Sequence, residues 1–356
     1  MTINLNNYGL TPTLKATADQ QPTMTLARVT AQHREFYQVI TATGELTAMV
    51  SGHQRHQASG NVDFPTVGDW VLLTATDSDQ AQIQTILPRQ SVLVRGAAVG
   101  DGQGQLIAAN LNTVFICMSL NANFNVRRIE RYLTMVWESG AQPVVVLTKA
   151  DVTNNLAEQL AELEPVTIGV PVISCSAEMG TGLSELTPYL KAGQSVAFIG
   201  SSGVGKSTLI NRLMGAEVMT TKTIRSADAH GRHATTHRQL LRLPAGAVVI
   251  DTPGMRELQL VAGDLDRSFV DIATLAAKCH FRDCQHETEP GCAVRKAVEA
   301  GELSPERLAS YRKLQREMQY QGMDARQLEQ AKVARMFGSR REMKKFLKSA
   351  RPGGLV

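Results

Sequence analysis

The sequence predicts a multidomain protein with a small N-terminal β-barrel, a central α/β domain and a C-terminal helical region that holds a metal-binding cluster. Three observations lead to this prediction. Short apolar runs separated by turn residues occupy the N-terminal part of the chain. Strands then alternate with helices, which is typical of a parallel sheet. Finally, three cysteines and a histidine crowd into one short stretch ahead of the last helix.

Composition and charge bound the class of protein. The 356 residues are 43% hydrophobic and 20% charged, and no apolar run approaches the length of a bilayer span. Residues 1–24 are polar and lack the apolar stretch of a signal peptide, so we expect a mobile tail on a cytoplasmic protein without membrane contact. The net charge is +4, but the chain from residue 301 onward carries 13 Lys and Arg against 6 Asp and Glu. This end favours a polyanionic partner.

Residues 25–95 show a series of short strands broken by turn signals such as Thr43-Gly44. This spacing predicts a small barrel with OB-like topology, although any small antiparallel sheet would give the same pattern. A glycine-rich stretch then predicts a linker over residues 96–107. The five expected strands cover residues 35–40, 46–50, 67–74, 83–87 and 91–95.

Residues 108–260 are predicted to form the α/β domain. Five apolar runs supply its buried strands, at residues 114–118, 144–147, 172–173, 196–199 and 248–250. Helical stretches lie between these runs, at residues 126–138, 156–164, 183–190 and 206–214. The alternation favours a parallel sheet covered by helices.

A glycine-rich loop between the strand at 196–199 and the helix at 206–214 matches the P-loop pattern G-x-x-x-x-G-K-S. Its backbone N–H groups and the helix N-terminus suit phosphate, and Lys206 would reach the β and γ oxygens in a catalytic role. Ser207 would supply a hydroxyl to Mg²⁺. The residues expected to bind nucleotide here are Gly200, Ser201, Ser202, Gly203, Val204, Gly205, Lys206, Ser207 and Thr208.

The run Asp251-Thr252-Pro253-Gly254 follows the strand at residues 248–250. A carboxylate at the C-terminal end of such a strand suits an outer contact to Mg²⁺ beside a P-loop. The same four residues would also form an ordinary turn. The neighbouring P-loop favours nucleotide binding by Asp251 and Gly254.

Thr148-Lys149-Ala150-Asp151 ends another strand and resembles the N-K-x-D motif that recognises guanine, with Thr148 in place of asparagine. Asp151 can accept two hydrogen bonds from guanine, whereas adenine would leave this carboxylate unpaired. The stem of Lys149 would lie along the base, and Ser176-Ala177 resembles the loop that closes over it. A surface Lys-x-Asp is common by itself, so the motif gains its weight from the P-loop. Together they predict GTP or GDP, with Mg²⁺, as the ligand.

The order of these motifs is unusual. The base-recognition segments at 148–151 and 176–177 precede the P-loop at 200–207, whereas an ordinary GTPase has them after it. A circular permutation preserves the sheet, because natural termini lie at the surface and can be relocated. The sequence therefore predicts a circularly permuted P-loop GTPase domain.

The C-terminal region, residues 261–356, carries the cysteine cluster and at least one helix beginning at Ser304-Pro305. Four nitrogen and sulfur ligands in a short loop suit one tetrahedral structural Zn²⁺. His280 is a further candidate, but it directly adjoins the first ligand. The expected zinc ligands are Cys279, Cys284, His286 and Cys292.

Taken together, the barrel, the permuted motif order, Thr-Lys-x-Asp and the C-x₄-C-x-H-x₅-C spacing resemble the ribosome small-subunit-dependent GTPases of the RsgA/YjeQ type, over about residues 26–346. The resemblance implies a three-domain GTPase that binds the small (30S) ribosomal subunit and its 16S rRNA, and we expect the protein to be a monomer. In that family, hydrolysis of GTP to GDP and phosphate acts in late subunit maturation and is stimulated by the subunit.

The resemblance also implies roles for residues 231–236, which align with the first switch. Thr235, or alternatively Thr236, would coordinate Mg²⁺, and Ala234 departs from the usual threonine. Met255 stands where many GTPases carry a glutamine that orients water, so His233 is the catalytic candidate in its place. His233 could instead be a loop histidine beside phosphate-binding Arg232.

Two other functions compete with this prediction. An ATP-dependent small-molecule kinase also needs a P-loop and Mg²⁺, but Asp151 and the cysteine cluster argue against it. An RNA-binding scaffold with a regulatory or vestigial nucleotide site would explain the barrel and the basic C-terminal end, but intact Lys206, Ser207 and Asp251 argue against it.

Overall fold

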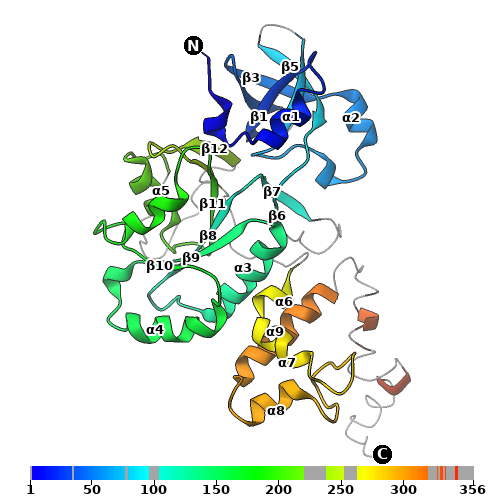
Figure 1. The fold of residues 1–356 in the computed structure, drawn as a ribbon, viewed down its shortest axis with the longest axis vertical. Helices are drawn as coiled ribbons and strands as arrows, with labels where there is room; N and C mark the ends of the chain where they lie inside the picture. The colour runs from blue at the N-terminus through cyan, green and yellow to red at the C-terminus, as the bar shows by residue number, and fades with distance from the viewer. Residues whose placement is uncertain are drawn as a thin grey trace, which may run out of the picture.

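The computed structural model describes residues 2–33, 36–76, 79–95, 104–219, 238–251 and 263–319, with residues 327, 329–331, 333 and 341–343 near the C-terminus. Figure 1 shows three bodies along the chain, a blue barrel, a green α/β domain and a yellow and orange group of helices. This arrangement confirms the predicted fold class. None of the helices described combines the length and apolarity needed to cross a membrane.

Five strands close into the N-terminal barrel, in the order β1-β2-β3-β5-β4 with β4 returning to β1. The β3–β5 pair is parallel and the other pairs are antiparallel. Alternate side chains such as Val29, Val39 and Ile83 fill the interior. The strands are β1 Thr25–Gln32, β2 Tyr37–Thr41, β3 Glu45–Val50, β4 Trp70–Ala75 and β5 Gln80–Ile86, with the short helices α2 Gly52–Gln57 and η2 Asn61–Asp63 between β3 and β4.

The strand content of the barrel differs from the prediction in two places. The sequence analysis missed β1, which pairs with both β2 and β4. The strand expected at residues 91–95 is instead β6 Val92–Arg95, which leaves the barrel and pairs with β7 Gln105–Ala109. The predicted linker therefore ends inside a strand, and its residues 96–103 lie outside the described ranges.

Residues 1–24, which the sequence analysis expects to be a mobile tail, contain two short helices in the structure. Residues Leu5–Tyr8 form the 3₁₀-helix η1 and Pro12–Ala18 form α1, whose N-cap Thr11 accepts a hydrogen bond from the backbone of Leu14. Leu5 and Leu14 are buried with Trp70 of the barrel in one apolar cluster. A few well-spaced apolar residues thus anchor a segment whose average composition is polar.

Arg28 joins the N-terminal segment, the barrel and the α/β domain. It is fully buried on β1, and its guanidinium donates to the Tyr8 carbonyl, to the Gly68 carbonyl at 3.2 Å and to Ser195 Oγ at 2.9 Å. Burial lowers the pKa of Arg28 to about 9, and the negative charge of Asp69 offsets part of this shift by raising the pKa. Because the group remains charged at neutral pH, these acceptors hold the three segments in one arrangement.

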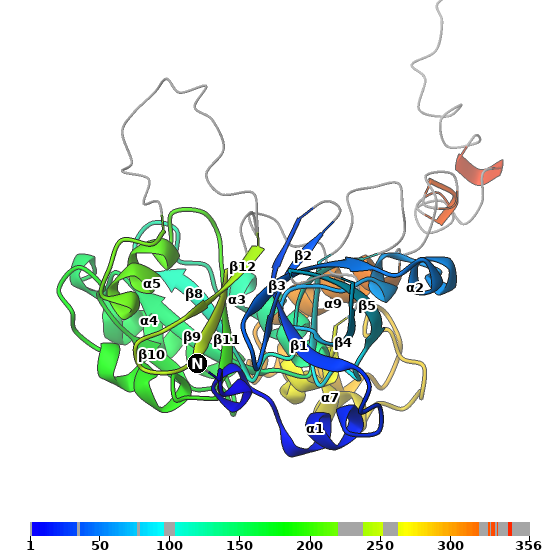
Figure 2. The same ribbon diagram turned by 90° about the horizontal axis from the view of Figure 1, so that it is seen from above.

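The α/β domain contains five parallel strands in the order β10-β9-β8-β11-β13, edged by antiparallel β12. Its strands are β8 Thr113–Ser119, β9 Gln142–Thr148, β10 Val172–Ser174, β11 Ser195–Ile199, β12 Arg238–Arg242 and β13 Val248–Asp251. The sequence analysis missed β12. This strand pairs with β1 through Ala31 and Gln239, so the domain sheet and the barrel form one continuous eleven-stranded sheet. Figure 2 shows β12 lying between the two bodies.

Helices cover both faces of this sheet. The α-helices are α3 Val126–Ser139, α4 Leu156–Leu163 and α5 Lys206–Met214, and the 3₁₀-helices are η3 Ala150–Val152, η4 Glu164–Val166 and η5 Leu183–Tyr189. α3 buries Ile129 and Leu133 in a cluster with Ile116 of β8, whereas Leu209 of α5 belongs to the cluster on the opposite face. The permuted order of the motifs is therefore compatible with an ordinary parallel sheet that has helices on both faces.

The C-terminal region packs its helices against α3 (Figure 1). These are α6 Leu265–Ser268, α7 Val270–Ala276, α8 Ala293–Glu299 and α9 Pro305–Gln319. Phe269, Ile272 and Leu308 share one apolar cluster with Ile129 and Leu133 of α3. The region therefore has no separate core of its own among the described residues, but shares that of the α/β domain.

Buried ion pairs accompany this apolar contact. Glu130 on α3 is fully buried and accepts from Arg307 of α9 at 2.8 Å and from Ser310 Oγ at 2.5 Å. Arg307 also binds Asp271 through two nitrogen atoms, at 2.5 and 2.8 Å. Because breaking a buried pair leaves an uncompensated charge, this network sets how α9 sits on α3. Arg131 and Glu317 add a bidentate pair at its edge, at 2.6 and 2.7 Å.

Candidate nucleotide and metal sites

The P-loop connects β11 to α5, as its sequence predicts. Gly200 has a φ of 144°, and a Cβ there would lie 2.4 Å from the Cys117 carbonyl oxygen of β8, so only glycine fits. Gly205, with a φ of 95°, precedes the first residue of α5. The loop thus curls at the carboxyl edge of the sheet and leads into a helix N-terminus, an arrangement that binds phosphate.

Lys206 arches back over this loop. Its Nζ donates to the carbonyl oxygens of Gly200 at 2.7 Å and Ser201 at 2.8 Å. Ser207 and Thr208 follow in the first turn of α5 and are half-buried. The ammonium group is therefore held beside the loop, where the β and γ oxygens of a nucleotide are expected.

Thr148 connects the base-recognition segment to the P-loop. Its hydroxyl lies 2.5 Å from the Val204 carbonyl oxygen and 3.3 Å from that of Met118. The threonine that replaces the usual asparagine of this motif therefore contacts the backbone of the P-loop. Lys149 adopts a left-handed φ of 58° and donates from Nζ to the Gly203 carbonyl at 2.8 Å. Two side chains thus join segments that are more than fifty residues apart.

Asp151 lies exposed on η3, directly after β9. The backbone N–H of Ala150 donates to the Cys175 carbonyl at 3.1 Å, which ties this turn to the end of β10. Ser176 and Ala177 follow there, and Ser176 Oγ accepts from the Met179 backbone at 3.1 Å. Because β9 and β10 are neighbouring parallel strands, the two predicted base-binding segments emerge side by side.

Several predicted site residues fall outside the described part of the chain. Asp251 ends β13 next to β11, but the structure describes only its backbone. Gly254, His233 and Thr235 lie in ranges that are not described. Their roles stay predictions.

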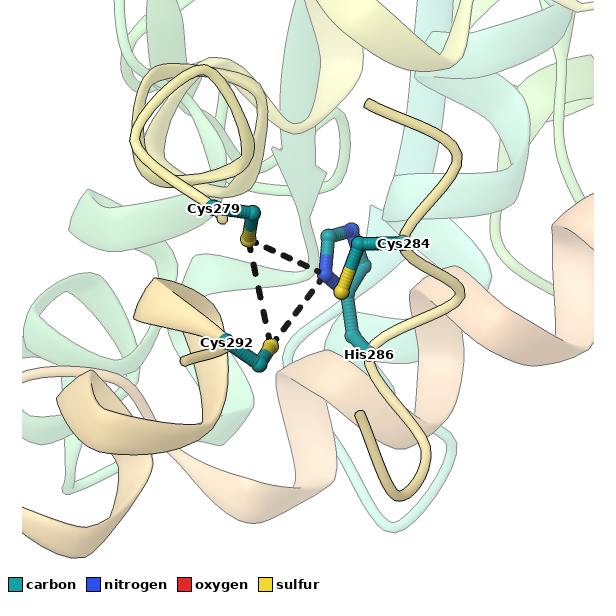
Figure 3. A group of neighbouring side chains, drawn as sticks. All are labelled: Cys279, Cys284, His286 and Cys292. Carbon is teal, nitrogen blue, oxygen red and sulfur yellow. Dashed lines mark hydrogen bonds between the residues drawn. The ribbon is translucent and has the colours of Figure 1, made fainter. Parts of the chain in front are cut away.

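The cysteine cluster has the dimensions of a tetrahedral metal site. Cys279, Cys284, His286 and Cys292 place their ligand atoms within 4.8 Å of one another (Figure 3). The Cys279 and Cys292 sulfur atoms are 3.9 Å apart, and His286 Nδ1 is 3.6 and 3.4 Å from them. A zinc tetrahedron with its usual bond lengths has sulfur–sulfur edges of about 3.8 Å and sulfur–nitrogen edges of about 3.6 Å. The four side chains therefore fit zinc, and His280 is not part of the cluster.

The surroundings of the cluster favour ionisation of the Cys279 thiol and a neutral His286 imidazole, whereas burial raises the pKa of the Cys284 thiol to about 11. Burial opposes ionisation of Cys279, but the backbone N–H groups of Val294 and Ala293 outweigh it and lower the pKa of its thiol. Cys292 is the N-cap of α8, and its sulfur accepts from the Arg295 backbone at 3.4 Å. Burial, assisted by the charge of Arg312, lowers the pKa of His286. Thiolate and neutral imidazole are the ligand forms that zinc requires.

Comparison with known proteins identifies the family. A model of the RsgA GTPase family matches residues 86–261. The small ribosomal subunit biogenesis GTPase RsgA 2 of Lactiplantibacillus plantarum is 59% identical over 345 residues, which cover 97% of this chain and 98% of that protein. The chain belongs to the RsgA GTPase family. The RsgA protein of Opitutus terrae is 46% identical over 307 residues, 83% of each chain.

Solved structures agree with this family and with the permuted fold. YjeQ from Thermotoga maritima superposes with a TM-score of 0.62 at 27% identity, over 83% of this chain and 99% of that one. YloQ, described as a circularly permuted GTPase, has a TM-score of 0.60 over 83% of this chain and 95% of that one. At 23% identity, the latter likeness concerns the fold alone. The predicted RsgA/YjeQ resemblance is therefore confirmed. Family membership also implies a guanine nucleotide and Mg²⁺.

The sequence analysis missed one residue that organises the loop of the candidate metal cluster in this RsgA family member. The Glu289 carboxylate accepts from the backbone N–H groups of Gln285 and Glu287 at 2.8 Å and of Thr288 at 3.0 Å. Its own backbone N–H and that of Gln285 are the leading causes that lower the pKa of Glu289 to about 2. The carboxylate thereby orders residues 285–289, the part of the loop that carries His286. The run of polar residues around it gave no signal of this contact.

Replacing Glu289 with alanine is expected to release zinc about tenfold faster to a chelator, because the ligand-bearing loop loses three hydrogen bonds that orient it. A colourimetric chelator assay on the purified protein measures the rate. Glu299→Ala is the matched control, since among the described residues Glu299 makes only an exposed pair with Arg295, at 3.6 Å on α8. Equal rates of zinc release in the two variants would show that Glu289 does not help to retain the metal.

Proposed function

We propose that this chain hydrolyses GTP to GDP and phosphate on the small ribosomal subunit, as a switch in late subunit maturation. The relatives named above are small ribosomal subunit biogenesis GTPases, which supports the class of reaction and the partner. The observation that carries the proposal is the contact of Thr148 and Lys149 with the P-loop. It brings a guanine-type recognition segment against the phosphate loop.

Selection of guanine is assigned to the loop after β9. The Asp151 carboxylate is exposed and can accept from the two donors on the guanine edge. The stem of Lys149 can cover one face of the base, since its Nζ is anchored on Gly203. Ser176 and Ala177 would close the pocket from the end of β10. An adenine nucleotide would leave Asp151 without its donors, which argues against the kinase alternative.

Phosphate binding is assigned to residues 200–208, with Lys206 on the β and γ oxygens. Ser207 and Thr235, or Thr236 in place of Thr235, would hold Mg²⁺, which neutralises phosphate charge when bound, and Asp251 would make an outer contact to it. His233 would place the attacking water in this chain. The usual glutamine is absent because Met255 occupies its position.

The partner is assigned as the 30S subunit through its 16S rRNA. Residues from 301 onward carry 13 Lys and Arg against 6 Asp and Glu, and an OB-like barrel offers a second nucleic-acid surface. The cluster fits one Zn²⁺ per chain in a structural role, since all four ligands come from the protein. We propose a cytoplasmic monomer.

The test is GTP hydrolysis by the purified protein with and without purified small subunits, with ATP as the competing substrate. Because no glutamine follows Gly254, we expect slow turnover alone and at least about tenfold stimulation by the subunit. Co-sedimentation should show tighter binding with a non-hydrolysable GTP analogue than with GDP, weakening as salt rises. Unstimulated turnover and nucleotide-independent binding would support the scaffold alternative instead.

A further inference from the structure

An arginine from outside the recognised motifs contacts the P-loop. Arg128 lies in the first turn of α3, and its Nη1 donates to Ser201 Oγ at 3.1 Å and to the Asn123 carbonyl at 3.5 Å. Strands β8 and β11 are parallel neighbours, so the β8–α3 loop and the P-loop emerge together at the carboxyl edge. The two residues are 73 positions apart in the sequence, and no local motif relates them.

The position of Arg128 is not explained by the stability of its own helix. A cation near a helix N-terminus is disfavoured by the helix dipole, and the first turn of α3 holds no acidic residue. Its neighbour Arg127 offsets the unfavourable interaction with the helix dipole by pairing with Glu130 at 2.5 Å. Among the residues that the structure describes, no carboxylate pairs with Arg128. An unpaired cation beside a phosphate loop indicates an anionic ligand.

Arg128 and Lys206 contact the same residue, Ser201, near the start of the P-loop. Lys206, the residue that reaches the β and γ oxygens in P-loop proteins, has its Nζ 2.8 Å from the Ser201 carbonyl. Arg128 binds the hydroxyl of the same serine. The two cations therefore flank Ser201, at the end of the loop where the terminal phosphates are expected. Within the described residues, Arg128 donates through Nη1 alone, which leaves Nε and Nη2 available.

The helix that carries Arg128 is held firmly. Asn125 caps α3 by accepting from the Arg128 backbone at 2.9 Å. Two residues further along, Glu130 is fixed by Arg307 and Ser310 of α9. A side chain based on an anchored helix can hold a loop in one geometry at small entropic cost.

We propose that Arg128 is a positioning residue that holds the start of the P-loop through Ser201 and adds a second positive charge beside Lys206 at the terminal-phosphate end of the nucleotide. The inference deepens the proposed function and rests on it. Because Arg128 and Ser201 are only half-buried, solvent screens the charge and the effect is moderate.

The test measures the affinity of the full-length, zinc-loaded protein for a non-hydrolysable GTP analogue and for GDP by calorimetry. Arg128→Ala should bind the analogue about tenfold more weakly and GDP less than about threefold more weakly. Arg128→Lys should recover part of the loss for the analogue, because it restores the charge without the planar fork. Arg127→Ala is the matched control, since it removes the same charge from the same turn without contact to the P-loop, and its ratio of affinities should equal that of the wild type.

A double-mutant cycle tests the route through Ser201. If Arg128 acts by holding this serine, the losses in Arg128→Ala and Ser201→Ala will not add in the double variant. Unchanged zinc content and melting temperature show that the fold is intact. Equal losses for the analogue and GDP, or additive losses, would overturn the inference. A wild-type protein that binds ATP as tightly as GTP would instead defeat the proposed function.

Discussion

A Cys292→Ser protein is expected to lose its zinc and to melt at a markedly lower temperature than the wild type. Structural zinc contributes about 10–16 kcal/mol of apparent binding free energy in small domains, and removing one of four ligands forfeits much of it. Serine is itself a good N-cap, so it can accept from the Arg295 backbone as Cys292 does. The substitution therefore removes the metal ligand while retaining the cap of α8.

The shared core determines how the protein unfolds. From ligand spacing alone, loss of zinc would unfold the C-terminal region and spare the nucleotide site. In the structure, Cys292 and Val294 belong to the same apolar cluster as Ile129 and Leu133 of α3. Loss of zinc exposes part of that cluster, so we expect the melting of the α/β domain to shift as well.

Elemental analysis and calorimetric melting measure both effects. His280→Gln is the matched control, because this histidine adjoins Cys279 but stands outside the ligand cluster, so it should retain one equivalent of zinc. A Cys292→Ser protein with a full equivalent of zinc and an unchanged melting temperature would contradict the zinc assignment.

The second large effect is expected from Asp151→Asn, which should weaken GTP and GDP binding by about 10³-fold or more. The wild-type carboxylate accepts from two guanine donors, whereas the amide of asparagine places a donor against one of them. Xanthine carries a carbonyl in place of the exocyclic amine, so the variant should gain affinity for xanthine nucleotides. Titration with labelled GDP and XDP measures the exchange of preference.

Glu158→Gln on α4 is the control for this experiment. It removes one negative charge from an exposed position near the loop and should leave both affinities unchanged. Retained GDP affinity in Asp151→Asn, with no gain for XDP, would rule out this carboxylate as the reader of guanine.

Local patterns predicted the parts of the fold that carry strong signals. The strand before the P-loop and helix α5 were expected at residues 196–199 and 206–214, and the structure has them at Ser195–Ile199 and Lys206–Met214. A continuous apolar run and the glycines at its ends are local features of the chain, so the sequence alone is enough to predict these two elements. The close spacing of the four cluster ligands likewise indicated their joint site, although metal binding itself stays a prediction.

The missed elements depend on distant partners. β12, with the sequence Arg-Gln-Leu-Leu-Arg, has a weak strand pattern and is a strand because it pairs with β13 and β1. The N-terminal helices form because Leu5 and Leu14 meet Trp70. Strand propensity and average polarity are weak signals when tertiary contacts decide the outcome.

The amino-acid sequence by itself determined the chemistry of the protein: the P-loop, the permuted motif order, the guanine-type segment and the Cys₃His set. Each of these is a short run whose residue types and spacing specify what it can bind. Only the tertiary structure decided that Thr148 reaches Val204, that Arg128 reaches Ser201, and that Glu130 is buried on α3 beneath Arg307. The physical reason is that these contacts join segments dozens of residues apart, and their geometry follows from the packing of the whole sheet and its helices.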